Sequence, residues 1–319
     1  MSNIDEMMKI METVEYGFLD KDGHDIFKNK DVVEKFSKSY YLISPKELLE
    51  KKVGVCWDQV ELERMLFQEK GIKNETYFIY IDDANTLPSH TFLIYYDCNK
   101  VYWFEHAWYC EKGIHEYTNL NLLLNDVKEK FWKSRQDEVK PNLYNNINIY
   151  KYDRPNYNIS CSELFNFIYA SQEIFPYKLV RTTAKDIDRI KDYKLQTITE
   201  YTTNLSKSEK SKINNYVTNS VNEWIYKYKN IIVNEKVVGS ILIRTLKNGI
   251  LLDEIFIEDK YRNKGIGTAV INDLVLKHQK NIFLWVFKDN IKAFNLYKKL
   301  GFKIDSETKT RYYMKFNNK

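Results

Sequence analysis

The second half of the chain alternates between two hydrophobic periodicities. Short apolar runs bounded by polar turns predict strands, and longer stretches with an apolar residue every third or fourth position predict helices. The pattern predicts, in order, a strand, two helices, three strands, a helix, a strand, a helix and two closing strands: 177–182, 184–201, 206–228, 230–233, 237–245, 250–257, 267–279, 281–287, 291–300, a strand near 303, and 312–316. This order predicts an α+β fold in which the helices pack on one mixed sheet.

A polar, Asn-rich passage separates this half from the first. It spans residues 140–158, and after a short predicted helix the chain breaks again at Pro176. A chain of 319 residues is long enough for two domains of the usual size, about 100 to 200 residues each. We therefore expect one domain over 1–176 and a second over 177–319.

The composition is that of a folded globular protein. Hydrophobic residues make up 44% of the chain, with only 10 Gly and 5 Pro, which excludes a disordered or fibrous protein. No apolar run approaches the roughly 18 residues that cross a bilayer, and Asp5 and Glu6 lie where a secretory signal would be basic. We expect a cytoplasmic protein with no membrane partner. The cysteines have no metal-site spacing, so we expect reduced thiols and no metal; they are Cys56, Cys98, Cys110 and Cys161.

The two halves differ in charge. Residues 1–176 carry 21 Lys and Arg against 29 Asp and Glu, a net charge of −8, whereas residues 177–319 carry 28 against 15, a net charge of +13. A basic domain indicates an anionic partner, such as a phosphate-bearing cofactor, an acidic substrate or a nucleic acid. The aromatic and basic residues form no recognisable nucleic-acid motif, so we do not expect a nucleic-acid partner.

A glycine-containing turn in the basic half follows the predicted strand 250–257 and opens a helix. It consists of Arg262, Asn263, Lys264, Gly265, Ile266, Gly267 and Thr268. Two glycines let successive backbone N–H groups point at one place, and the helix start and the basic side chains add positive charge, which suits a pyrophosphate. An isolated G-x-G is more often an ordinary helix entry, so the turn needs a second signal.

That second signal is the segment 290–297, which reads Asn-Ile-Lys-Ala-Phe-Asn-Leu-Tyr and is followed by Leu-Gly-Phe at 300–302. The turn and this helix together resemble the GNAT family of acyl-coenzyme A dependent N-acetyltransferases over residues 177–319. The resemblance implies acetyl-CoA as cosubstrate and direct acetyl transfer to an amine acceptor, either a small molecule or a protein.

The resemblance also implies roles for individual residues. The pantetheine arm of acetyl-CoA would pair with the backbone around Phe256 and Ile257, which would supply the oxyanion N–H. Asn290 would contact the arm, and Tyr297, one turn beyond Ala293, would donate to the departing thiolate. The structural alternative for Tyr297 is a core aromatic on an amphipathic helix.

The amine must also lose a proton, and Asp253 and Glu254 are the candidate bases. Side chains alternate along a strand, so only one of the two is expected to face the cleft. The sequence leaves open which one does.

The acidic half contains a cysteine, a histidine and a carboxylate in an order that suits thiol catalysis. Cys56 lies at the start of a predicted helix that ends near Gly71, where the helix dipole favours a thiolate. His90 and Glu105 lie on two strands of a predicted hairpin in which Phe92 faces Glu105. They are therefore diagonal neighbours, and the carboxylate could orient the imidazole. The same parity places His106 on the opposite face.

This order resembles the transglutaminase-like superfamily, which also includes arylamine N-acetyltransferases, over about residues 40–170. The superfamily usually has Asp where Glu105 stands. The resemblance implies a papain-like fold and a possible Cys-His-Glu hydrolase or acyltransferase. The leading interpretation is an N-acetyltransferase fused to this domain. Two alternatives are principal chemistry at Cys56, as an amidase, protease or acyl transferase, and a degenerate first domain that binds the acceptor.

Overall fold

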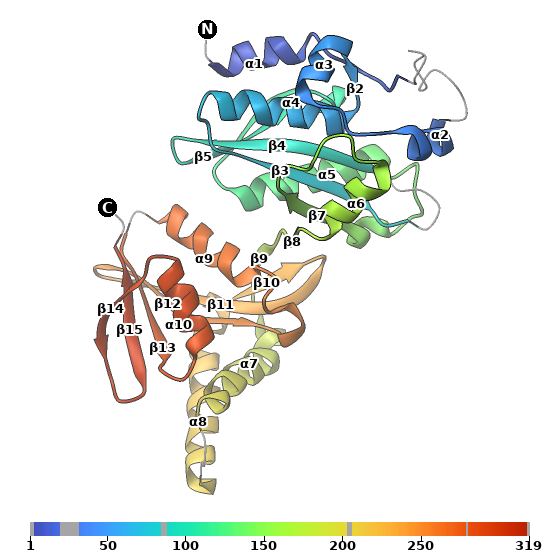
Figure 1. Cartoon of the computed structure of the whole chain (residues 1–319). Helices are drawn as coiled ribbons and strands as arrows, with labels where there is room; N and C mark the ends of the chain where they lie inside the picture. Colours follow the sequence, from blue (N-terminus) through green and yellow to red (C-terminus); the bar gives the residue numbers. More distant parts are fainter. Residues whose placement is uncertain (1–2, 20–31, 84–87, 203–205, 279, 318–319) are drawn as a thin grey trace. The chain divides into compact units, whose positions relative to one another are not determined.

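The computed structural model describes residues 3–19, 32–83, 88–202, 206–278 and 280–317. The chain forms two compact units, Met1–Phe175 and Pro176–Lys319, and each is described by itself (Figure 1). The division lies one residue from the boundary expected from the sequence. Within the described ranges, no helix is both long enough and apolar enough to cross a membrane.

The N-terminal unit is built on a six-stranded antiparallel sheet in the order β6-β5-β4-β3-β7-β8. Its strands are β3 (Asn74–Ile81), β4 (Ser89–Asp97), β5 (Lys100–Glu105), β6 (Gly113–Tyr117), β7 (Ile147–Tyr152) and β8 (Gln172–Ile174). A separate parallel pair joins β1 (Glu15–Tyr16) to β2 (Val53–Gly54). The helices are α1 (Asn3–Met11), α2 (Val32–Ser39), α3 (Pro45–Lys51), α4 (Cys56–Glu69), α5 (Leu120–Arg135) and α6 (Cys161–Tyr169), with short 3-10 turns at Tyr109–Glu111 and Leu143–Asn146.

Helices α4 and α5 cover opposite faces of this sheet. Leu93 of β4 belongs to an apolar cluster with Phe67 of α4, whereas its neighbour Ile94 belongs to a cluster with Phe131 of α5. Successive side chains of a strand point to opposite faces, so the two clusters are two cores, one on each side. The predicted hairpin is confirmed with its register, since Leu93 pairs with Phe104 and Asp97 pairs with Lys100.

The C-terminal unit contains one seven-stranded mixed sheet in the order β14-β15-β13-β12-β11-β10-β9, in which only β12 and β13 are parallel. The strands are β9 (Lys178–Arg181), β10 (Lys229–Val233), β11 (Lys236–Leu246), β12 (Gly249–Ile257), β13 (Ile282–Phe287), β14 (Lys303–Glu307) and β15 (Arg311–Phe316). The helices are α7 (Ile187–Glu200), α8 (Lys207–Trp224), α9 (Ile266–Lys277) and α10 (Ile291–Lys299), with 3-10 turns at Ala184–Asp186, Ile225–Lys227 and Asp259–Tyr261.

The predicted α+β order and mixed sheet of this unit are confirmed. The helix expected over 267–279 is α9, which begins one residue earlier; position 279 lies outside the described residues. Helices α7 and α8 pack on each other and on β11 and β12 through one apolar cluster, which includes Ile190, Val221, Leu242 and Phe256.

Strand β12 is irregular at its centre. On β11, Leu242 pairs with Glu254 but the next residue pairs with Leu252, so Asp253 is an extra residue in a β-bulge. On the other side, β12 pairs with β13 only over Ile250–Leu252. The two parallel strands therefore separate beyond Leu252, where the candidate site lies.

Candidate active site

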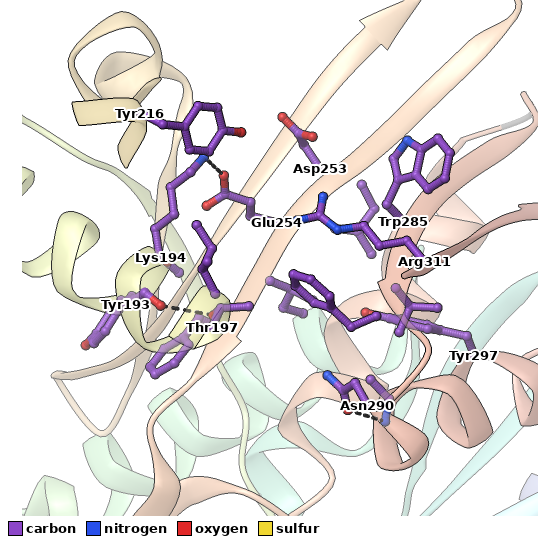
Figure 2. A pocket seen from close by; sticks show the side chains of 18 residues that line it. Tyr193, Lys194, Thr197, Tyr216, Asp253, Glu254, Trp285, Asn290, Tyr297 and Arg311 are labelled. Carbon is purple, nitrogen blue, oxygen red and sulfur yellow. Dashed lines mark hydrogen bonds and ion pairs between the residues drawn. The ribbon is translucent and has the colours of Figure 1, made fainter. Parts of the chain in front are cut away.

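A pocket of about 150 Å³ lies where β12 and β13 separate. Its walls come from β11, β12, β13, α7, α8 and α10, together with the first residue of β15 (Figure 2). The predicted site residues among its lining are Asp253, Glu254, Phe256, Asn290, Ala293 and Tyr297. The C-terminal unit thus gathers residues from seven elements around one cavity.

Both candidate bases are among the residues that line this pocket, so the lining does not choose between them. The bulge at Asp253 interrupts the strict alternation on which the expectation of a single inward carboxylate rested. Glu254 forms an ion pair with Lys194 through one carboxylate oxygen and accepts the Tyr228 hydroxyl, 2.7 Å away, through the other. Asp253 forms an ion pair with Arg244 at 2.8 Å. Each carboxylate therefore has its own cation.

Tyr297 lies on α10 with its side chain at the edge of the pocket, and it is buried. Burial raises the pKa of Tyr297 to about 12. Within the described ranges, its hydroxyl makes no hydrogen bond, although its ring packs against Phe302 at a centroid distance of 5.8 Å. Asn290 caps the same helix, since its side-chain oxygen accepts the Ala293 N–H at 3.1 Å. The Asn290 amide nitrogen is not used by this cap and remains for another acceptor.

The glycine-containing turn has an unusual backbone. Asn263 has φ 62° and Gly265 has φ 79°, and Gly265 is the N-cap residue of α9. Ile266, Gly267 and Thr268 form the first helical turn, with the Ile266 side chain buried. A left-handed residue directly before a helix turns the first N–H groups toward one place, as anion sites require. These residues are not in the lining of the pocket and form a separate part of the site.

The two basic residues of the turn do not point freely into solvent. Arg262 donates to the Ile257 carbonyl at 2.9 Å and forms an ion pair with Asp259 at 2.9 Å. Its guanidinium lies 5.4 Å from the centre of the Phe256 ring. The side chain of Lys264 lies over the Tyr261 ring. Arg262 thus ties the end of β12 to the turn, so its contribution to anion binding is smaller than that of a free arginine.

In the N-terminal unit, Cys56 is the first residue of α4, and His90 and Glu105 are buried nearby. Nε2 of His90 lies 2.9 Å from Oε2 of Glu105. The Cys56 side chain lies close enough to the imidazole to raise the pKa of His90. Since Nε2 faces Glu105, Nδ1 is the nitrogen left for the sulfur. Burial lowers the pKa of His90, but the Glu105 carboxylate and the Cys56 side chain outweigh it and raise the pKa to about 10.

Glu105 is held by more than the histidine. It also accepts the indole N–H of Trp103 at 3.1 Å and the backbone N–H of Trp108 at 2.7 Å. These donors fix the carboxylate against the imidazole. His106 follows the last residue of β5, so the alternation of side chains along that strand does not extend to it. Its Nδ1 lies 2.7 Å from the side-chain oxygen of Gln59.

Several residues near the two sites carried no signal in the sequence. Lys194 and Arg311 are single basic residues in segments that look solvent-exposed by pattern, yet both line the C-terminal pocket. In the N-terminal unit, Tyr16 lies close enough to Cys56 for the two side chains to interact, and burial with this neighbour raises the pKa of Tyr16. Burial also raises the pKa of Glu63, a residue of α4, well above its usual range, and the nearby Glu105 adds to this effect. Only the tertiary arrangement shows these partners.

Comparison with known proteins assigns the C-terminal site to a family. Residues 196–302, about a third of the chain, match the model of the Acetyltransferase (GNAT) family, so this unit contains a GNAT acetyltransferase domain. The spermine/spermidine N(1)-acetyltransferase of Bacillus subtilis (strain 168) is 37% identical over 67 residues, which are 19% of this chain and 44% of that protein. The chain thus spans less than half the length of this curated relative.

Solved structures of low identity are similar to a part of the chain. The PaiA N-acetyltransferase of Thermoplasma acidophilum in complex with coenzyme A is 14% identical, with a TM-score of 0.37, over 44% of this chain and 98% of that one. The ribosomal-protein-S18-alanine N-acetyltransferase of Escherichia coli is 16% identical, with a TM-score of 0.33, over 44% and 94%.

Proposed function

We propose that the C-terminal unit transfers an acetyl group from acetyl-CoA to a primary amine. The observation that carries the proposal is the separation of β12 from β13 beside a pocket that contains two carboxylates and a buried tyrosine. The separated edge of β12 has backbone groups that no neighbouring strand of the sheet pairs, which an extended pantetheine arm would satisfy. The turn before α9 would hold the pyrophosphate of the same molecule.

The chemistry divides among residues of this unit. The amine nitrogen attacks the thioester carbonyl, and a backbone N–H near Phe256 or Ile257 would stabilise the oxyanion. As the carbon–sulfur bond breaks, the thiolate takes a hydrogen bond or proton from Tyr297. The proton lost by the amine passes to Asp253 or Glu254, directly or through a water. The product is an amide and free coenzyme A.

The acceptor class is an amine, which agrees with the name of the matched Bacillus subtilis relative. That protein is named for acetylation of spermine and spermidine. The match covers less than half of that protein. Its name therefore supports only an amine nucleophile, and the remaining features of the acceptor have to be inferred from the pocket of this chain.

Substitution of Gly265 by valine tests cosubstrate binding. A side chain at this position obstructs the approach of a phosphate to the helix start, so calorimetric titration should show acetyl-CoA affinity reduced at least about tenfold. The matched control is Gly71→Val, because Gly71 also has a positive φ, of 67°, in the other unit. Unchanged affinity in a folded Gly265→Val protein would refute the assignment.

A second candidate function belongs to the N-terminal unit, where we propose thiol-dependent hydrolysis or acyl transfer at Cys56 in a transglutaminase-like domain. The observation that favours it is the 2.9 Å contact between His90 and Glu105, together with a Cys56 side chain close enough to raise the pKa of His90. Since the pKa of His90 is raised, the thiol proton can reside on the imidazole as an imidazolium that the carboxylate orients, and the thiolate can then attack a carbonyl. Without this reactivity, the unit would act as a binding module for the acceptor.

Alkylation by iodoacetamide, measured for each cysteine by mass spectrometry, tests this second function. Cys161 is an internal control, since it is also buried and burial raises its pKa. Near neutral pH, Cys56 should react at least about tenfold faster than Cys161, and His90→Asn should remove the difference. Equal rates in the unmodified protein would leave the binding module as the better account.

A further inference from the structure

The C-terminal pocket contains a cation that its carboxylates do not neutralise. The charged residues of its lining are Lys194, Asp253, Glu254 and Arg311. Glu254 pairs with Lys194, and Asp253 pairs with Arg244 from outside the lining. Arg311 forms no ion pair with any carboxylate in the described part of the chain. With Arg244 included, three cations stand against two carboxylates, so the pocket and its immediate surroundings keep one positive charge, although this is the site that must receive an amine.

Arg311 is held in place and aimed at the cavity. It is the first residue of β15 and pairs with Phe287 of β13, and its guanidinium lies 4.2 Å from the centre of the Phe287 ring. Phe287 in turn stacks on Tyr201 at 5.5 Å. Figure 2 shows the Arg311 side chain extending from its strand into the pocket, on the side of Trp285. An arginine restrained on an aromatic ring loses little further freedom when it binds an anion.

The two carboxylates are poorly placed to neutralise a second ammonium of the acceptor. Both oxygens of Glu254 are occupied, one by Lys194 and one by Tyr228. Lys194 is itself buried and donates a hydrogen bond to Ser220 at 2.8 Å. Moving its ammonium away from Glu254 would therefore cost free energy, because a buried charge would lose its partner. An acceptor with a second positive charge would meet Lys194 and Arg311, while the pocket carboxylates are already paired with Lys194 and Arg244.

We propose that the acceptor carries a carboxylate in addition to its amine, and that Arg311 binds this carboxylate. A guanidinium presents paired N–H donors that match a carboxylate in a bidentate arrangement. The proposal rests on the acetyltransferase function proposed above and narrows its acceptor to amino acids and peptides with an accessible carboxylate. It excludes diamines and polyamines, which lack any anionic group, as preferred acceptors.

Pairs of acceptors that differ only in the carboxylate provide the test. Lysine and 1,5-diaminopentane form one pair, and ornithine and 1,4-diaminobutane form a second. We expect kcat/KM to be about 10- to 100-fold higher for the amino acid of each pair, the usual gain from a hydrogen bond to a charged group. Arg311→Gln should remove this preference without changing acetyl-CoA affinity, and Arg311→Lys should retain part of it. The matched control, Arg181→Gln, changes an exposed arginine of β9 outside the pocket and should leave the preference intact.

The outcomes separate this inference from the function on which it rests. If the diamines are acetylated as well as the amino acids, or if Arg311→Gln leaves the preference unchanged, the inference is wrong while the acetyltransferase function stands. If acetyl-CoA binds but no amino acid is acetylated, the acceptor class is also wrong. If acetyl-CoA does not bind the unmodified protein, both the inference and the proposed function fail.

Discussion

Removal of one oxygen atom from Tyr297 isolates its proposed role. The ring is buried and packs against Phe302, and Phe preserves that packing. Since the hydroxyl has no hydrogen-bond partner in the described ranges, Tyr297→Phe leaves no polar group of the protein unpaired. We therefore expect the free energy of unfolding to change by no more than about 0.5 kcal/mol.

The expected loss of rate follows from the raised pKa. Burial raises the pKa of Tyr297 to about 12, whereas an ordinary thiol has a pKa of about 8.5. Complete proton transfer from this tyrosine to a thiolate is uphill by roughly 3.5 units, or about 5 kcal/mol. The hydroxyl should therefore act mainly as a hydrogen-bond donor to the developing thiolate. Such a bond to a charged group contributes about 1.5 to 3 kcal/mol, which corresponds to a loss in kcat of about 10- to 150-fold.

The assay follows release of the coenzyme A thiol with a chromogenic disulfide, at saturating acceptor. A pre-steady-state measurement must first establish that chemistry limits turnover, since slow product release would hide the effect. Calorimetry should show unchanged acetyl-CoA affinity, because the thiolate exists only after the thioester breaks.

A matched variant separates chemistry from a general structural loss. Tyr177→Phe removes a buried hydroxyl of the same unit that donates to Asp273 at 2.6 Å, remote from the pocket lining. It should lower stability more than Tyr297→Phe and leave kcat unchanged. Equal kcat for unmodified protein and Tyr297→Phe, with chemistry limiting, would return Tyr297 to the role of a core aromatic.

Two further predictions concern ionisable groups. Asp253→Asn and Glu254→Gln each replace one pocket carboxylate by its amide. The variant that lacks the true base should lose the acidic limb of the pH dependence of kcat/KM, and the other variant should keep it. If both variants keep that limb, neither carboxylate is the base. In the N-terminal unit, the pKa of His90 is raised to about 10. The folded state therefore keeps a proton on His90 that the unfolded chain loses above about pH 6.5. The free energy of unfolding consequently falls as the pH rises toward 10. Urea unfolding should show that the free energy of unfolding decreases by about 2 kcal/mol between pH 7.5 and 9.5, and Glu105→Gln should largely remove this decrease. An equal decrease in both proteins would contradict the pairing of His90 with Glu105.

Long periodic elements of this chain were predictable because their apolar positions repeat over many residues. The mixed sheet and the helices of the C-terminal unit follow from such patterns. The β4–β5 hairpin register was predictable for a different reason. Its connection is short and symmetric, with Cys98 and Asn99 at positive φ, so one pairing fixes the remainder.

The buried polar face of α4 has no comparable signature. Asp58, Glu61, Glu63 and Arg64 would be assigned to a solvent-facing side by pattern, yet all four are buried. Their partners are distant in sequence: Asp58 accepts the Tyr40 hydroxyl at 2.8 Å, and Arg64 donates to Thr76 as well as to Glu61. Burial then raises the pKa of Asp58 to about 7. Arg64 and Glu61 pair within the helix, whereas Tyr40 and Thr76 reach this face from other elements, and apolar periodicity does not reveal either kind of contact.

The bulge at Asp253 connects the missed features of the C-terminal site. An extra residue in β12 has no signature in the pattern of apolar and acidic residues, yet it lies where Asp253 and Glu254 are both among the residues that line one cavity. Two adjacent carboxylates in a partly buried pocket would repel each other unless each had a cation, which Arg244 and Lys194 supply. With both carboxylates paired in this way, the further cation Arg311 is left for a ligand. The local backbone irregularity thus determines the charge of the pocket and, through it, the chemistry of the acceptor.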